Sequence, residues 1–137
     1  MKKTLLLLII LLSSNSIYGQ EYTIRGKIID DNLSDLIGVE IKNLTSNLQV
    51  FSDESGMFEI KSNKGDSLYF SFIGLTSEKL VISDQSKIKL IMIDRSVNCL
   101  GAEWSTRDYK KADKQIQKRL NVLYKKADEK NIWLDLL

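Results

Sequence analysis

The sequence of 137 residues contains no histidine and a single cysteine, Cys99, which narrows the chemistry that its side chains can perform. Without histidine there is no Ser–His or Cys–His nucleophile pair, no H-E-x-x-H zinc site and no histidine-bound zinc. No Gly-Lys-Ser/Thr sequence occurs, so a phosphate-binding loop is also absent. Cys99 cannot form an intramolecular disulfide and is most simply a small apolar residue, with an intermolecular disulfide as the alternative. We therefore expect no enzyme activity and no cofactor.

Acidic residues are the remaining candidates for chemistry. Asp30, Asp31 and Asp35 gather in one polar segment, which could suggest calcium. That segment lacks the D-x-[DN]-x-[DN]-G spacing and the distal glutamate of an EF-hand loop, so we predict that these side chains cap a turn or helix. The 18 acidic residues do not exclude a glycosidase-type carboxylate pair, but nothing in the pattern places two of them in one dry cleft. We expect no metal site and no catalytic residue.

The segment 50–75 predicts three short strands joined by two tight turns, and it forms the middle of the expected fold. Aspartate caps its own backbone and glycine tolerates a positive φ, so 53–56 and 63–66 read as turns. Apolar and polar residues alternate on either side of them, the pattern of half-buried strands. Similar short strands are expected over 22–30, 39–41, 48–52, 80–82 and 88–93, which together predict an all-β sandwich of about seven strands. The predicted turn residues are Asp53, Gly56, Gly65, Asp66 and Gly74; the predicted core residues are Ile24, Ile28, Val39, Ile41, Phe58, Ile60, Leu68, Phe70 and Phe72.

The same segment resembles the carboxypeptidase regulatory-like domain. The resemblance lies in Ser52-Asp53 through Gly56, in Phe58 and Ile60, and in the run Leu68 to Gly74 after Gly65-Asp66, and it covers roughly residues 22–93. It implies a transthyretin-like Greek-key sandwich of the kind found in exported proteins and at the N-terminus of TonB-dependent outer-membrane receptors. The family's carboxypeptidase activity belongs to a separate zinc domain. The sequence departs from the family in having no proline and in its last strand, where Leu100–Ser105 stands.

The N-terminus predicts export. Lys2 and Lys3 precede an apolar run from Leu5 to Leu12, followed by small and polar residues that end at Gly19, as in a cleaved signal peptide. A retained anchor is the alternative, although the run is far shorter than the ~20 residues needed to span a bilayer. We expect a signal peptide over 1–19, a β-sandwich domain over 20–105 and a basic helix with an apolar tail over 106–137. The expected location is the periplasm or the outer-membrane periphery, with secretion as a further option.

A long amphipathic helix is predicted to begin near Arg107, behind a capping box formed by Ser105 and Asp108. Apolar residues recur at gaps of three and four along one stripe. Residues 107–130 hold 9 Lys/Arg against 4 Asp/Glu, whereas residues 21–106 hold 9 against 13. We expect the helix to project from the sandwich and to contact a partner; docking on the protein's own sandwich is the alternative. The predicted partner-binding residues are Tyr109, Ile116, Leu120, Leu123, Lys111, Lys114 and Lys118.

Three classes of function remain after these exclusions. The first is an exported, non-catalytic module for protein–protein interaction or structural support in the cell envelope, and it is the one we favour. The second is a glycan- or peptide-binding module that uses loops of the sandwich, with Tyr69 and Trp104 as candidate aromatic residues. The third is association of the basic helix with an anionic membrane surface. Nucleic acid is not an expected partner, because basic and aromatic residues do not interleave.

Overall fold

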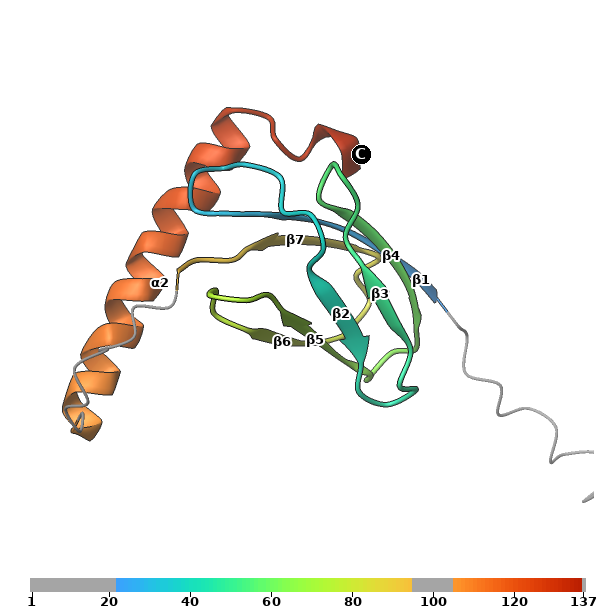
Figure 1. Ribbon diagram of the computed structural model, residues 1–137, viewed down its shortest axis with the longest axis horizontal. Coiled ribbons are helices and arrows are strands. Elements are labelled where there is room, and N and C mark those ends of the chain that lie inside the picture. The colour runs from blue at the N-terminus through green and yellow to red at the C-terminus, as the bar shows by residue number, and fades with distance from the viewer. Residues whose placement is uncertain (1–21, 95–104, 137) are drawn as a thin grey trace, which may run out of the picture.

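A computed structural model describes residues 22–94 and 105–136 of the chain. Its strands form two packed sheets, a three-stranded one in the order β4-β1-β7 and a four-stranded one in the order β3-β2-β5-β6 (Figure 1). One long helix and a short 3₁₀ turn follow the strands. The predicted fold class, a β-sandwich of seven strands followed by a C-terminal helix, is confirmed. The elements are β1 (Tyr22–Ile29), β2 (Glu40–Asn43), β3 (Gln49–Phe51), β4 (Met57–Ser62), β5 (Ser67–Ser71), β6 (Glu78–Val81), β7 (Lys87–Ile91), α2 (Thr106–Glu129) and η2 (Leu134–Leu136).

The strands pair in antiparallel fashion except at one place. β1 lies at the centre of the three-stranded sheet, antiparallel to β4 and parallel to β7. β2 and β5 form the centre of the other sheet, with β3 and β6 at its edges. The edge strands of both sheets therefore present backbone N–H and C=O groups that could pair with another strand, unless another part of the chain covers them.

The inner faces of the two sheets form the main hydrophobic core. Phe58 on β4 and Phe70 on β5 meet edge to face across the sandwich, with ring centroids 5.6 Å apart. The prediction for Phe72 is wrong: β5 ends at Ser71, and Phe72 is 36% exposed in the turn that follows. The other eight predicted core residues are buried: Ile24, Ile28, Val39, Ile41, Phe58, Ile60, Leu68 and Phe70.

Side-chain carboxylates hold the turns, as the sequence predicts. Asp53 accepts hydrogen bonds from the N–H groups of Ser55 and Met57, both at 2.9 Å. Burial raises the pKa of the Asp66 carboxyl, but hydrogen bonds outweigh it and hold the pKa below its ordinary value. These bonds come from the Asn63 N–H at 2.9 Å and the Asn43 amide at 2.8 Å, among others.

The acidic segment after β1 is also a capped turn. Asp30 accepts hydrogen bonds from the N–H groups of Asn32 and Ser34, both at 2.8 Å. Across the described ranges, 22–94 and 105–136, no group of three His, Cys, Asp or Glu side chains is arranged to hold a metal ion. The two hydrogen bonds confirm the turn-capping role predicted for Asp30. Asp31 and Asp35, for which the sequence predicts the same role, instead form ion pairs with Arg119 and Lys27.

We expect Phe70→Ala to lower the free energy of unfolding by roughly 3–5 kcal/mol, because it removes a fully buried aromatic ring. Phe72→Ala is the matched control, and its half-exposed ring should cost less than about 1 kcal/mol. Urea unfolding of both variants measures the difference. Equal losses would mean that the two rings are buried to the same extent, which would contradict the end of β5 at Ser71.

Candidate functional site: the C-terminal helix and the outer face of the three-stranded sheet

The three-stranded sheet is apolar on both of its faces near one end. Ile28, Leu90 and Met92 point into the sandwich, and the alternate residues Ile29, Ile91 and Ile93 form a second buried cluster on the outside. Side chains alternate between faces along a strand, so consecutive buried residues require cover on both sides. The C-terminal segment, 105–136, supplies the outer cover (Figure 1).

The helix begins where the sequence predicts. Ser105 and Asp108 form a complete capping box, in which each side chain accepts a hydrogen bond from the other residue's backbone N–H. α2 then continues for 24 residues, a length of about 36 Å at 1.5 Å per residue. This is longer than the edge of the sandwich that it contacts, so its two halves have different surroundings.

The C-terminal half of α2 docks on the protein's own sandwich. Leu120, Leu123 and Ala127 are buried, and Ile116 is partly buried at the edge of the same cluster. Trp133 and Leu136, from the segment after the helix, complete the cover. The expectation that the helix projects along its whole length and offers Leu120 and Leu123 to a partner is therefore wrong, because these side chains bury the apolar outer face of β1 and β7.

A tyrosine of α2 closes the exposed edge of β7. The Ile91 N–H donates a hydrogen bond to the Tyr124 hydroxyl at 3.1 Å, and that hydroxyl donates to the Lys89 carbonyl at 3.3 Å. Burial raises the pKa of Tyr124, which keeps the hydroxyl protonated and able to donate. One side chain thus satisfies two backbone groups that a neighbouring strand would otherwise bind.

The rest of the C-terminal segment is held by aromatic and ionic contacts. Trp133 stacks on Tyr124 with ring centroids 6.3 Å apart, and the Lys89 ammonium lies 5.6 Å from the Trp133 ring. Lys89 also pairs with Asp128 at 3.3 Å, and Arg119 pairs with Asp31 of the β1–β2 connection. The Lys89–Asp128 pair is exposed, so we expect it to contribute less than about 1 kcal/mol, whereas the Asp31 side chain is only 21% exposed and its pair with Arg119 is partly shielded from solvent.

Lys27 is the one buried cation among the described residues, and it ties η2 to the sheet. Its ammonium pairs with Asp135 at 2.7 Å and with Asp35 at 3.2 Å. Burial alone lowers the pKa of Lys27, but the two carboxylates outweigh that effect and raise the pKa above its usual value. Lys27 therefore stays charged, and removing its partners would leave a buried charge without compensation.

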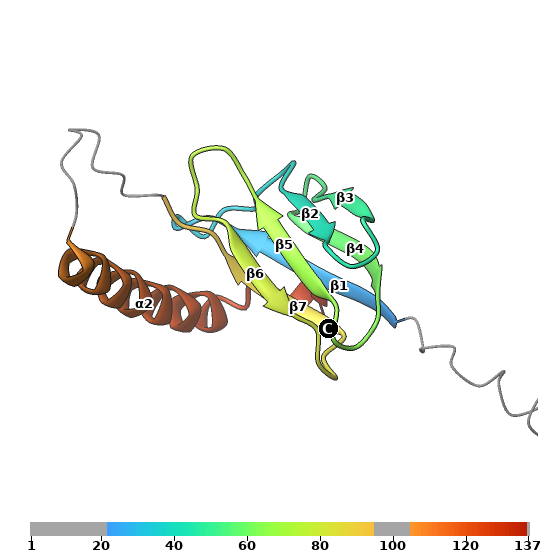
Figure 2. The ribbon, with the colours of Figure 1, turned by 90° about the horizontal axis from the view of Figure 1, so that it is seen from below.

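The N-terminal half of α2, residues 106–115, extends past the sandwich, and its residues are exposed to solvent apart from Ala112, which is half-buried. We call this segment the projecting half; it lies beyond the edges of both sheets in Figure 2. Its apolar stripe begins at Tyr109, which is 58% exposed. Of the predicted partner-binding lysines, Lys111 and Lys114 lie on this half and Lys118 just after it, and all three are exposed. The prediction of a projecting helix thus holds for this half alone.

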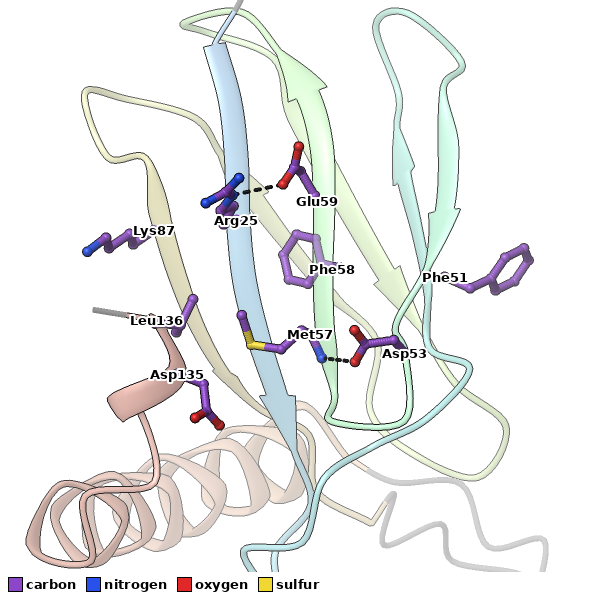
Figure 3. Close-up of a pocket in the computed structure, with 9 residues that line it drawn as sticks. All are labelled: Arg25, Phe51, Asp53, Met57, Phe58, Glu59, Lys87, Asp135 and Leu136. Atoms are coloured by element: carbon purple, nitrogen blue, oxygen red, sulfur yellow. Dashed lines mark hydrogen bonds and ion pairs between the residues drawn. The ribbon is translucent and has the colours of Figure 1, made fainter.

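A groove of about 570 Å³ lies beside η2, on the part of the outer face that α2 leaves open. Met57 and Leu136 give it an apolar floor, and Arg25 and Glu59 form an ion pair of 2.8 Å at its rim (Figure 3). Both members of this pair are more than half exposed. The other charged residues that line the groove, Asp53, Lys87 and Asp135, are exposed as well, so among the described lining residues no charged side chain is buried.

The other residues singled out from the sequence lie apart from this site. Tyr69 is on β5, half-buried, and its partners across the sheet are Lys42 and Lys79. Cys99 and Trp104 lie outside the described residues. In the described part of the chain, no helix is both long enough and apolar enough to cross a bilayer.

Comparison with known proteins does not assign a family. No protein-family model and no curated protein matches the chain. Among solved structures, it is similar to a chain of a type II cohesin–X-dockerin complex from Acetivibrio cellulolyticus, with a TM-score of 0.46 and 14% identity over 61% of this chain and 64% of that one. It is also similar to a streptococcal ancillary pilin, with a TM-score of 0.38 and 7% identity over 59% and 33%. A group B streptococcus pilus 2b backbone protein gives a TM-score of 0.34 and 18% identity over 61% and 47%. This chain spans less than two thirds of the length of each of these chains.

We expect Tyr124→Phe to lower the free energy of unfolding by about 1–2 kcal/mol, because it leaves the Ile91 N–H and the Lys89 carbonyl without their partner. Tyr69→Phe is the matched control, since the Tyr69 hydroxyl makes no hydrogen bond to the described part of the chain, and it should change stability by less than about 0.5 kcal/mol. Urea unfolding measures both. A neutral Tyr124→Phe would show that the hydroxyl does not pair with the edge of β7.

Proposed function

We propose that this chain is a non-catalytic β-sandwich module of the cell envelope that binds another protein through the projecting half of α2. The observation that carries the proposal is the division of the helix. Its C-terminal half buries the outer face of the sheet, while its N-terminal half continues past the sandwich with the same apolar stripe and a basic surface.

The composition of the projecting half supports a partner. Lys110 and Lys114 are like charges four residues apart, followed by Lys118 at the same spacing, and each such pair destabilises an isolated helix by a few tenths of a kcal/mol. Helical segments without tertiary contacts are also only marginally stable in water. An amphipathic helix that lays its apolar stripe into a groove of a partner is a common mode of recognition, and an acidic groove would relieve the repulsion between the lysines.

The location and the absence of catalysis rest on the sequence. The basic, apolar and small residues over 1–19 favour export, which supports an envelope protein. The chain has no histidine, and the charged side chains that line the groove beside η2 are exposed to solvent. These features favour binding or structural support over a reaction.

Site-specific photo-cross-linking in intact cells tests the proposal. A photo-cross-linking amino acid in place of Lys111, on the projecting half, should give a protein adduct of defined mass. The same amino acid in place of Lys125 is the matched control, because that lysine is also exposed but lies on the docked half. We expect an adduct from position 111 and none of the same mass from position 125. No adduct at 111, or the same adduct at both positions, would contradict the proposed role of the projecting half.

A further inference from the structure

One end of the four-stranded sheet carries large apolar side chains on its surface. Ile73, in the β5–β6 connection, is 97% exposed; Phe51 is 60% exposed, Ile37 56% and Phe72 36%. We call these four residues the apolar end. Single exposed apolar residues are common, but a group of them at one place marks an interaction surface.

The strand register places these residues together. Glu40, the first residue of β2, lies opposite Phe51 on one side and Ser71 on the other, and Phe72 and Ile73 follow Ser71 directly. On the β3 side, the Gly38 N–H donates to the Ser52 carbonyl at 3.0 Å, which sets Ile37 beside the end of β3. Figure 3 shows Phe51 pointing away from the sandwich into solvent. The surface is therefore assembled from three separate connections of the chain.

The same connections are strongly acidic. The segments 30–40, 51–57 and 71–78 contain no lysine or arginine. Asp31 forms an ion pair with Arg119, and Asp35 forms one with Lys27. Within 22–94 and 105–136, the remaining acidic residues of these three segments form no ion pair. Beside the apolar end itself lie Glu40, opposite Phe51, and Asp53 and Glu54, just after Phe51, none of which has an ion pair in the described part of the chain. The surface thus combines exposed apolar groups with negative charge, and the complementary partner is apolar and basic. The acidic residues of these segments are Asp30, Asp31, Asp35, Glu40, Asp53, Glu54 and Glu78.

The projecting half of α2 has that composition. Over 106–115 it carries four lysine or arginine residues against two aspartates, and Lys118 follows on its exposed side. Tyr109 supplies an exposed aromatic ring on its apolar stripe. We propose that the projecting half of one copy binds the apolar end of a second copy of this chain. This inference rests on the proposed function, because it names the partner of the same surface.

The contact has to form between copies. The C-terminal half of α2 is fixed on the sandwich by its buried leucines and by Tyr124, so the projecting half keeps its direction away from the sheets (Figure 2). The apolar end of the same chain accordingly remains exposed. Each copy carries one surface of each kind, so two copies can exchange both contacts in a closed dimer or many copies can join head to tail.

Sedimentation of the purified mature chain at concentrations up to about 1 mM tests the inference, a range suited to the weak affinities of small interfaces. We expect a mass above the monomer that falls as salt is raised, because part of the attraction is electrostatic. Ile73→Asp should weaken association at least about tenfold, by placing a charge in the apolar contact. Its matched control is Val81→Asp, at the opposite end of the same sheet, which should change association less than about twofold.

Sedimentation also tests the contribution of the projecting half to self-association. A mixture of two variants then shows whether the projecting half of one copy binds the apolar end of another. Lys111→Glu/Lys114→Glu should abolish association, while Lys125→Glu/Lys130→Glu, on and directly after the docked half, should not. The Ile73→Asp chain keeps an intact helix and the Lys111→Glu/Lys114→Glu chain keeps an intact apolar end. Each variant alone should therefore be monomeric, and a mixture of the two should form a complex.

The outcomes separate this inference from the proposed function. A wild-type chain that stays monomeric at every concentration, or a mixture of variants that fails to associate, overturns self-association. A cross-link from position 111 to a different protein would then still support the proposed function. An adduct of twice the chain's mass supports both, and the absence of any adduct together with a monomeric chain overturns both.

Discussion

The outer face of the three-stranded sheet imposes the main constraint on this structure. Ile29, Ile91 and Ile93 leave an apolar surface on the side of β1 and β7 that faces away from the sandwich. In water this surface would be exposed beside the unpaired edge of β7, an arrangement that invites association with other chains. α2 and η2 bury the surface, and Tyr124 binds the edge. The helix is therefore part of the folded domain, and the buried Lys27–Asp135 pair fixes the segment that follows it.

This constraint accounts for only half of the helix. The apolar cluster ends at Ile116, so residues 106–115 bury nothing of the sandwich in spite of their apolar stripe. The ion pair of Arg119 with Asp31 lies near the point where the two halves meet. The buried leucines and Tyr124 of the docked half hold the direction of the projecting half. The C-terminal half of α2 is fixed because the outer face of the three-stranded sheet needs cover. It therefore acts as a rigid support for the projecting half, which carries the basic surface.

The sequence predicted the sandwich, the turns and the start of the helix, because these depend on local signals. Alternation identified Phe58 and Phe70, and the Ser105–Asp108 spacing identified the cap. The error at Phe72 arose because alternation does not show where a strand ends. The docking of the helix was missed because it depends on contacts between distant segments. One signal could have revealed it: the consecutive apolar residues Ile28-Ile29 and Leu90–Ile93 are typical of a strand that is covered on both faces. The apolar end was also missed, since only the strand register brings Ile37, Phe51 and Ile73 to one place.

Hydrogen exchange along α2 tests the central claim, that one helix has a structural half and a projecting half. We expect amides over 120–127 to exchange as slowly as those of β7, because both open only when the outer core opens. Amides over 110–115 should exchange at least about 100-fold faster in the isolated monomer, since the buried cluster that α2 forms with the described sandwich does not include them. Uniform protection along α2 would mean that the projecting half is packed on the sandwich. Fast exchange along the whole helix would mean that α2 does not cover the sheet. Either result would contradict the division of α2 into a structural half and a projecting half.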